Sequence, residues 1–216
     1  SSVSKRAGRL LGHAKDPITV GLALEALVGV DYFKRSGAGV ICLGAGGSGI
    51  ALAWYLAHRA DRPGRVVLAG LRTHSVDHAR LVLRHSGAPE GVFDFHVLDP
   101  ADPARAAGEL VAAAPPGSLI VNATGMGKDR PGSPLPDDVV FPEAAVVWEF
   151  NYRGSLEFLG QARARAQERR LAVSDGWQYF IHGWSEVIAE VFDIPMPPTT
   201  VAELAAIAAT VRDSQL

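Results

Sequence analysis

The sequence predicts a doubly wound parallel α/β sheet followed by further C-terminal helices. Three observations support this fold class. An apolar run leads into a glycine-rich turn at residues 40–49, strand-type and helix-type segments alternate through the middle of the chain, and 48% of the 216 residues are hydrophobic. Such a content is ample for a real core. Strands that alternate with helices favour a parallel sheet covered on both faces.

The strand and helix segments follow one another in a regular order. Strands are expected at residues 40–43, 65–69, 93–98, 118–122 and 144–150. Helices between them are expected at residues 48–59, 75–85 and 103–114. Clusters of glycine and proline separate these segments. The Gly-, Pro- and Asp-rich residues 125–142 are expected to form a loop at the carboxyl end of a strand, where open α/β sheets bind ligands.

Helical patterns complete the chain. Residues 156–170 show an amphipathic pattern whose arginines are interpreted as a solvated face. An apolar stripe at helical spacing runs from Trp177 to Val191 and is interpreted as core or as a domain contact. Thr200 and Glu203 have the spacing of a capping box, which predicts a last helix after two prolines.

Composition and charge narrow the classes of partner. A formal net charge of −2 and a pI near 6.4 favour a small-molecule ligand over nucleic acid or an anionic membrane. The single cysteine, Cys42, lies in an apolar strand, and the histidines lack the spacing of a metal site, so no metal is expected. A single cysteine allows no disulfide framework, so a cytoplasmic location is expected. The apolar segment 18–30 is too short to span a bilayer, and nothing resembles a signal peptide.

The glycine turn Gly44-x-Gly46-x-x-Gly49 is the strongest functional signal. Gly44 allows a sharp turn after the strand, Gly46 leaves room for phosphates, and Gly49 lets strand and helix approach closely. N–H groups at the start of the next helix would face the anion. The pattern predicts a Rossmann NAD(P)-binding domain; a glycine turn without a ligand is the alternative. The expected cofactor-binding residues here are Gly44, Ala45, Gly46, Gly47, Ser48 and Gly49.

The residues after the second strand favour NADP over NAD. An NAD site would offer an acidic residue about 20 positions beyond the turn, and none is present in residues 66–75. Arg72 instead supplies a guanidinium suited to a 2′-phosphate, and Thr73 supplies a hydroxyl. The alternative is that Arg72 only solvates a loop.

Several further motifs stand in a fixed order along the chain. They are LGHAKD at 11–16, GAGGSG at 44–49, LRT at 71–73, VNATGMG at 121–127, GSPLP at 132–136, Glu149-x-x-Tyr152, and Gly176 at the start of the closing helix. Together and in this order they resemble the shikimate dehydrogenase family over nearly the whole chain. The resemblance implies an NADP-dependent alcohol dehydrogenase that acts reversibly on a cyclic polyhydroxy acid or cyclitol.

The resemblance also implies a domain plan and a wider cofactor site. Residues 1–15 would be a remnant of an N-terminal substrate domain, residues 16–175 the NADP domain, and residues 176–216 helices that return to the substrate domain. The family's catalytic lysine would lie outside these residues. The additional cofactor-binding residues implied are Asn122, Ala123, Thr124, Gly125, Met126 and Gly176. The apolar C-terminal helices would cover either the missing domain or a second subunit of a homodimer.

Four residues are candidates for catalysis or substrate binding. By the resemblance, Asp16 matches the family's catalytic aspartate; alternatively, Asp16-Pro17 is an ordinary helix N-cap. Tyr152 would contact substrate or pack under a helix. Lys128 would bind an anion or point into water. His182 would supply a polar group in place of the family's glutamine, where Gly183 now stands, or act in proton transfer, or serve only as a structural hydrogen-bond partner.

Departures from the family pattern widen the range of substrates. The altered positions are Leu71, Gly125, Lys128, Glu149 and Gly183, so shikimate itself is only one candidate. A noncatalytic NADP-binding sensor or partner module is the alternative function.

Overall fold

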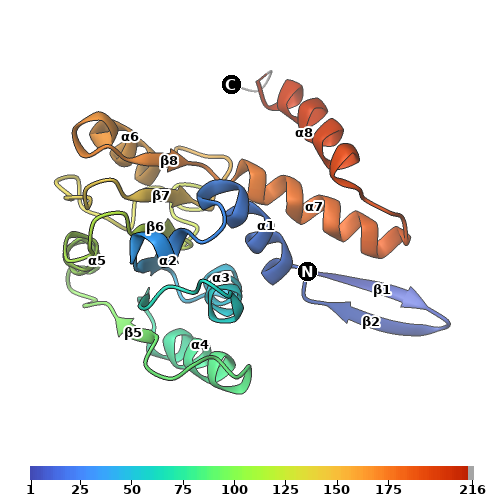
Figure 1. The fold of residues 1–216 in the computed structure, drawn as a ribbon, viewed down its shortest axis with the longest axis horizontal. Coiled ribbons are helices and arrows are strands. Elements are labelled where there is room, and N and C mark those ends of the chain that lie inside the picture. Colours follow the sequence, from blue (N-terminus) through green and yellow to red (C-terminus); the bar gives the residue numbers. More distant parts are fainter. Residues whose placement is uncertain (214–216) are drawn as a thin grey trace.

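The computed structural model describes residues 1–213 and is built around one six-stranded parallel sheet (Figure 1). Its strands are β3 (Val40–Leu43), β4 (Val66–Gly70), β5 (Phe93–Val97), β6 (Leu119–Asn122), β7 (Val146–Glu149) and β8 (Ala172–Ser174). They lie in the order β5-β4-β3-β6-β7-β8, and all neighbours are parallel. Counted from β3, this is the 3-2-1-4-5-6 order of the Rossmann fold. The predicted fold class is confirmed.

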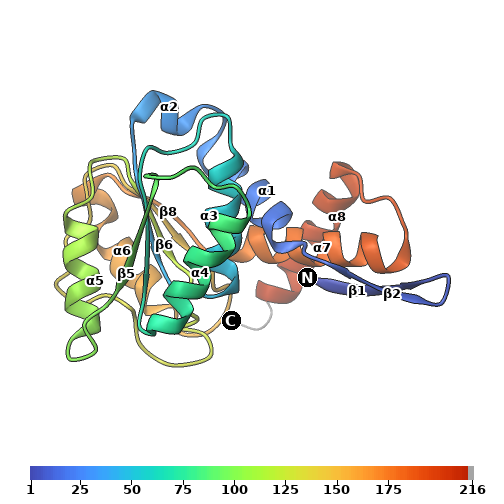
Figure 2. The same ribbon diagram turned by 90° about the horizontal axis from the view of Figure 1, so that it is seen from below.

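Helices cover both faces of the sheet (Figure 2). The helices on one face are α1 (Asp16–Val28), α3 (Gly47–His58) and α4 (Thr73–His85), and those on the other are α5 (Pro103–Ala112) and α6 (Glu157–Arg169). Successive side chains of β3 point to opposite faces. Val40 and Cys42 therefore pack with the first group, whereas Ile41 and Leu43 pack with the second.

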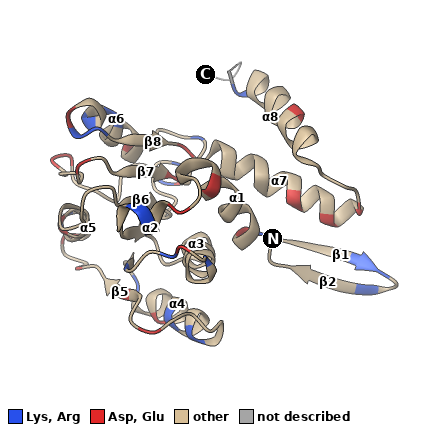
Figure 3. Ribbon diagram, in the orientation of Figure 1, with Lys and Arg blue, Asp and Glu red and all other residues tan. Residues whose placement is uncertain are grey.

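A hairpin and two helices lie beside the sheet domain. The hairpin consists of β1 (Ser2–Arg6) and β2 (Arg9–His13), and the helices are α7 (Trp177–Phe192) and α8 (Pro198–Asp213). Helix α7 packs against α1, α8 and β1. Glu190 of α7 accepts a hydrogen bond from Arg6 at 2.9 Å and pairs with Lys15 at 2.8 Å. Figure 3 shows the matching charges, with basic residues on the hairpin and acidic residues along α7.

The structure corrects several predicted boundaries. Helix α4 begins at Thr73 rather than residue 75, which places Arg72 at its N-cap position. The Thr200–Glu203 capping box is wrong, because α8 already begins at Pro198 and Thr200 lies inside its first turn. The hairpin, strand β8 and the short helix α2 (Tyr32–Ser36) were not predicted. Within residues 1–213, none of the helices has the length and apolar character needed to cross a bilayer.

Two glycines bring α3 close to the sheet. A Cβ atom on Gly49 would lie 2.0 Å from the carbonyl oxygen of Gly44. Gly44 itself has a φ of 119°, and a Cβ atom there would lie 2.5 Å from the carbonyl oxygen of Ala123. A side chain at either position would collide with backbone that cannot move independently of the sheet. The turn therefore requires glycine at both positions.

The close approach at Gly49 gives a stability test. Gly49→Ala is expected to lower the free energy of unfolding by about 1–3 kcal/mol, because the new methyl group overpacks against backbone. Gly47→Ala is the matched control, since a Cβ atom at Gly47 meets nothing within 4 Å. It is expected to remain within about 1 kcal/mol of the wild type. Urea denaturation measures both, and equal stability of the two variants would contradict the packing argument.

Candidate functional site

Two cavities lie along the carboxyl edge of the sheet and share one wall. The first, which we call the turn cavity, has a volume of about 380 Å³ and is lined by the glycine turn and the residues that follow β4. The second, which we call the α7 cavity, has a volume of about 520 Å³ and is lined by residues of α1, α7 and the segments that follow β6 and β7. Ala123 and Thr124, directly after β6, line both cavities. A ligand that occupies both cavities would pass this wall.

The turn cavity has the features of an anion site. Gly44, Ala45 and Gly46 line it, and Cβ atoms built on Gly46 and Gly47 would meet nothing within 4 Å. Helix α3 begins at Gly47, so its first N–H groups have no partner within the helix. Free N–H groups and the helix dipole together favour a phosphate group. The residues present therefore fit the pyrophosphate of a dinucleotide.

Two arginines give the turn cavity a positive charge. Arg72 lines it from the N-cap position of α4, and Arg130 lines it from the loop after β6. No carboxylate is among the residues that line this cavity in the described part of the chain. The sequence does not identify Arg130 as a site residue, because it lies in a loop whose course the residue pattern does not reveal. Thr73, expected to contact the cofactor, begins α4 and does not line the cavity.

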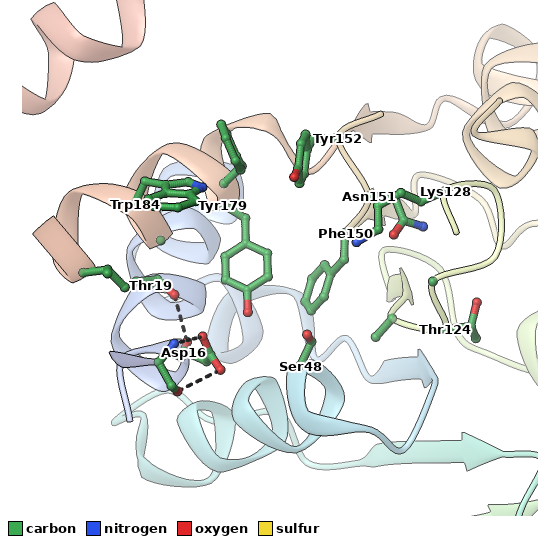
Figure 4. Close-up of a pocket in the computed structure, with 16 residues that line it drawn as sticks. Asp16, Thr19, Ser48, Thr124, Lys128, Phe150, Asn151, Tyr152, Tyr179 and Trp184 are labelled. Carbon is green, nitrogen blue, oxygen red and sulfur yellow. Dashed lines mark hydrogen bonds and ion pairs between the residues drawn. The ribbon is translucent and has the colours of Figure 1, made fainter. Parts of the chain in front are cut away.

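The α7 cavity combines polar groups with an aromatic wall (Figure 4). Three of the four predicted catalytic or substrate-binding residues line it, namely Asp16, Lys128 and Tyr152. Tyr152 stacks on Phe180 with ring centroids 4.2 Å apart. The structure thus brings together residues that are up to 136 positions apart in the sequence.

Asp16 faces this cavity and is not a helix cap. Helix α1 begins at Asp16 itself, its N-cap position is Lys15, and no side chain caps it. The N-cap interpretation of Asp16 is therefore wrong. Its carboxylate instead accepts a hydrogen bond from the hydroxyl group of Ser1 at 3.2 Å. With 45% of its side chain exposed, Asp16 is accessible from the cavity.

Lys128 lies at another part of the same cavity. Its ammonium nitrogen is 5.8 Å from the centroid of the Tyr152 ring and 3.4 Å from a carboxylate oxygen of Asp129. A cation over an aromatic face is attracted by the ring. The cavity therefore has a positive group beside Tyr152 and a negative group at Asp16.

Several other predicted site residues line neither cavity, among them Gly47 and Gly49 of the glycine turn. His182 lines neither cavity; burial lowers its pKa, an effect partly opposed by Glu186. Its neighbour Gly183 lines the α7 cavity instead. Gly176 is buried at the start of α7. A Cβ atom there would lie 2.0 Å from the carbonyl oxygen of Phe150, so close packing requires glycine at this position.

A buried carboxyl group belongs to the hydrogen-bond network that holds the shared wall of the two cavities. Glu149 is fully buried, and its two carboxyl oxygens accept hydrogen bonds from Asn122 Nδ2 at 2.7 Å and from the Asn151 N–H at 2.8 Å. Asn122 Oδ1 in turn accepts from the N–H of Thr124 at 3.0 Å. Asn122, expected to bind the cofactor, is fully buried and lines neither cavity, so its side chain holds the loop that does.

The loop held in this way contributes to both cavities. Gly125 lines the α7 cavity and Met126 lines the turn cavity. Asn151 Nδ2 donates to the Met126 carbonyl oxygen at 2.9 Å, which ties this part of the loop to the end of β7. Glu149 was noted in the sequence only as a departure from a family motif, because its burial and its partners depend on the tertiary structure.

Comparisons with known proteins identify the class of fold. No protein-family profile and no curated protein matches the sequence. Among solved structures, quinate dehydrogenase from Corynebacterium glutamicum in complex with NAD is similar over 96% of this chain and 66% of its own, with a TM-score of 0.72 and 22% identity. The chain therefore shares the fold of the part of this dehydrogenase that it matches.

The particular enzymes it resembles are the shikimate and quinate dehydrogenases, as the sequence motifs predicted. A shikimate dehydrogenase in complex with NADP+ matches with a TM-score of 0.66 and 18% identity, over 96% of this chain and 65% of its own. Shikimate 5-dehydrogenase from Thermus thermophilus, in complex with NADP(H) and shikimate, matches with a TM-score of 0.60 and 25% identity, over 95% and 67%. The chain aligns with the C-terminal NAD(P)-binding part of such enzymes and spans about two thirds of their length.

The buried Glu149 predicts a pH-dependent stability. Burial raises the pKa of Glu149 from its ordinary value of 4.5 to about 7, against the lowering effect of its hydrogen bonds. A raised pKa means that folding favours the protonated carboxyl group. Its stabilising contribution is therefore complete below about pH 4.5 and is lost as the pH rises through about 7.

Glu149→Gln removes this titration. Between pH 5 and pH 8, the wild type is expected to lose up to about 3 kcal/mol of unfolding free energy relative to the variant. Urea denaturation at a series of pH values measures the difference between the two proteins. A difference that stays constant with pH would show that Glu149 does not titrate in this range.

Proposed function

We propose that the protein is an NADP-dependent oxidoreductase that transfers hydride reversibly between NADPH and a carbonyl group of a cyclic polyhydroxy acid or cyclitol. The observation that carries the proposal is the shared wall of Ala123 and Thr124. On one side of it lies a cavity that fits a dinucleotide, and on the other lies a cavity with Asp16, Lys128 and Tyr152. The similar structures that contain NAD, NADP and shikimate support the same class of reaction.

The charge of the turn cavity supports NADP as the cofactor. Among the similar structures, the quinate dehydrogenase and one shikimate dehydrogenase hold NAD, whereas two other shikimate dehydrogenases hold NADP, so the choice depends on this chain's own residues. Arg72 and Arg130 line the cavity without an accompanying carboxylate among its described lining residues. A second arginine strengthens the attraction for a ligand that carries one phosphate more than NAD.

The residues of the α7 cavity would bind and orient the substrate. When bound, NADPH supplies the hydride. Lys128 would attract a substrate carboxylate, and the Tyr152 hydroxyl would hydrogen-bond to the same end of the molecule. Asp16 would accept a hydrogen bond from a substrate hydroxyl group and orient the group that exchanges the proton with it.

A noncatalytic NADP-binding sensor or partner module is the second candidate. One observation favours it: Lys128 is the one lysine lining either cavity in the described residues, and its ammonium group lies near the Asp129 carboxylate. Lys15, adjacent to Asp16, pairs with Glu190 at 2.8 Å. Neither lysine is therefore placed as a free proton donor beside Asp16.

Replacing Arg72 tests the cofactor. Arg72→Ala is expected to weaken NADPH binding about 10–100-fold and to leave NADH binding nearly unchanged, because only NADPH has the 2′-phosphate that the guanidinium would contact. Fluorescence titration with both cofactors measures the two dissociation constants. Arg84→Ala, an exposed arginine of the same helix that lines neither cavity, is the control. Equal affinities for NADPH and NADH before and after the substitution would refute NADP specificity.

Replacing Asp16 tests the enzyme assignment. Asp16→Asn in the full-length protein is expected to lower kcat about 100-fold on the best member of a panel of cyclic hydroxy acids and cyclitols. NADPH affinity should not change, since Asp16 does not line the turn cavity. Asp31→Asn is the control for the charge change at an exposed position. If the wild type binds NADPH but oxidises no compound of the panel, the sensor is the better explanation.

A further inference from the structure

Helix α7 presents Tyr179 and Gly183, one turn apart, to the α7 cavity. Residues at this spacing lie on the same face of a helix. Gly183 stands where the sequence resemblance implies a glutamine, and a Cβ atom there would meet nothing within 4 Å. Because His182 lines neither cavity, it does not replace that polar group. Tyr179 supplies a hydroxyl group to the cavity within one turn of Gly183.

The ring of Tyr179 is fixed by aromatic neighbours. Its centroid lies 4.9 Å from that of Phe150 and 6.1 Å from that of Trp148. Both neighbours are buried, with 8% and 2% of their surfaces exposed, and belong to the core beneath the sheet's carboxyl edge. Such packing restricts the ring to one orientation. The hydroxyl group is thereby held at a defined place in the cavity.

The hydroxyl group of Tyr179 points toward Asp16 and Ser48 (Figure 4). Asp16 begins α1 and Ser48 lies in the first turn of α3, so the phenol reaches the place where the N-termini of these two helices meet the cavity. Ser48 also belongs to the glycine turn that borders the turn cavity. The phenol oxygen therefore lies on the side of the α7 cavity that adjoins the dinucleotide site.

The surroundings keep this phenol protonated. Burial raises the pKa of Tyr179 to about 12, with the nearby negative charge of Asp16 acting in the same direction and the hydroxyl groups of Ser48 and Thr19 opposing the shift. At neutral pH the group is a neutral hydrogen-bond donor. An ionised Asp16 carboxylate can only accept, so the two side chains offer complementary hydrogen-bonding roles.

We propose that Tyr179 is a catalytic residue, whose phenol O–H donates a hydrogen bond to the substrate oxygen that is a carbonyl in the ketone and a hydroxyl in the alcohol. The proposal rests on the proposed function. The substrate would extend across the cavity, with its anionic end at Lys128 and Tyr152 and its reacting oxygen between Tyr179 and Asp16. Negative charge develops on a carbonyl oxygen as hydride arrives, and a preorganised donor stabilises it.

Tyr179→Phe in the full-length protein tests this role, since it removes the hydroxyl group and keeps the ring packed on Phe150 and Trp148. Oxidation of quinate and shikimate with NADP+ is expected to show a kcat about 100-fold below that of the wild type. Calorimetric titration of the cofactor-free protein with quinate should give a dissociation constant raised about tenfold. NADPH affinity and the urea midpoint should not change. Tyr32→Phe is the matched control, because the Tyr32 hydroxyl donates to the Gly117 carbonyl outside both cavities.

The outcomes separate this inference from the proposed function. If the wild type oxidises quinate or shikimate and Tyr179→Phe retains its kcat and its quinate affinity within twofold, the role of Tyr179 is overturned and the enzyme assignment stands. The role of Tyr179 is also overturned if Tyr179→Phe weakens NADPH binding by as large a factor as it lowers kcat. The hydroxyl group would then contact the cofactor and not the substrate. A wild type that binds NADPH but oxidises neither these two compounds nor any other member of the panel of cyclic hydroxy acids and cyclitols overturns the proposed function, and this inference falls with it.

Discussion

The close contact between the Gly44 carbonyl group and Gly49 is the constraint on which the rest of the molecule depends. It places the start of α3 directly beyond the end of β3, with no side chain between them. The same turn forms the floor of the turn cavity and carries Ser48 into the α7 cavity. A looser turn would move the anion site and the substrate-side cavity apart. One backbone contact thus sets the spacing between the two halves of the site.

The wall between the two cavities is also held by buried polar groups that line neither cavity. The buried pair of Glu149 and Asn122 holds the backbone of Thr124 in place through hydrogen bonds of 2.7 and 3.0 Å. Buried polar networks of this kind are costly when partly satisfied and rigid when complete. Buried side chains therefore hold the wall between the cavities in its position, and the wall is formed before a ligand binds.

Most of the sheet could be predicted from the sequence because β3, β4, β6 and β7 are largely apolar, fully buried runs, and glycine and proline clusters separate the elements. Strand β8 has only three residues, and four of the five residues of β2 are exposed, so neither gives a burial pattern that a sequence can reveal. The glycine turn, Arg72 and Asp16 were found because motif spacing fixes their place. Tyr179 and His182 could not be distinguished, since helical periodicity alone does not say which face of α7 meets a cavity.

The attachment of the β1–β2 hairpin has a consequence for the ionic environment of the site. A two-stranded hairpin has little stability of its own. Arg6 of this hairpin pairs with Glu190 of α7, and Lys15, two residues after the hairpin, pairs with the same carboxylate. The pairing with Lys15 contributes most to keeping the pKa of Glu190 low, so the carboxylate stays charged. The side chains of Lys15 and Glu190 are only 13% and 19% exposed, so salt screens this pair much less than a pair at the surface. Because Lys15 directly precedes Asp16, this ion pair restrains the backbone next to Asp16 and helps to keep the edge of the proposed active site in place at raised ionic strength.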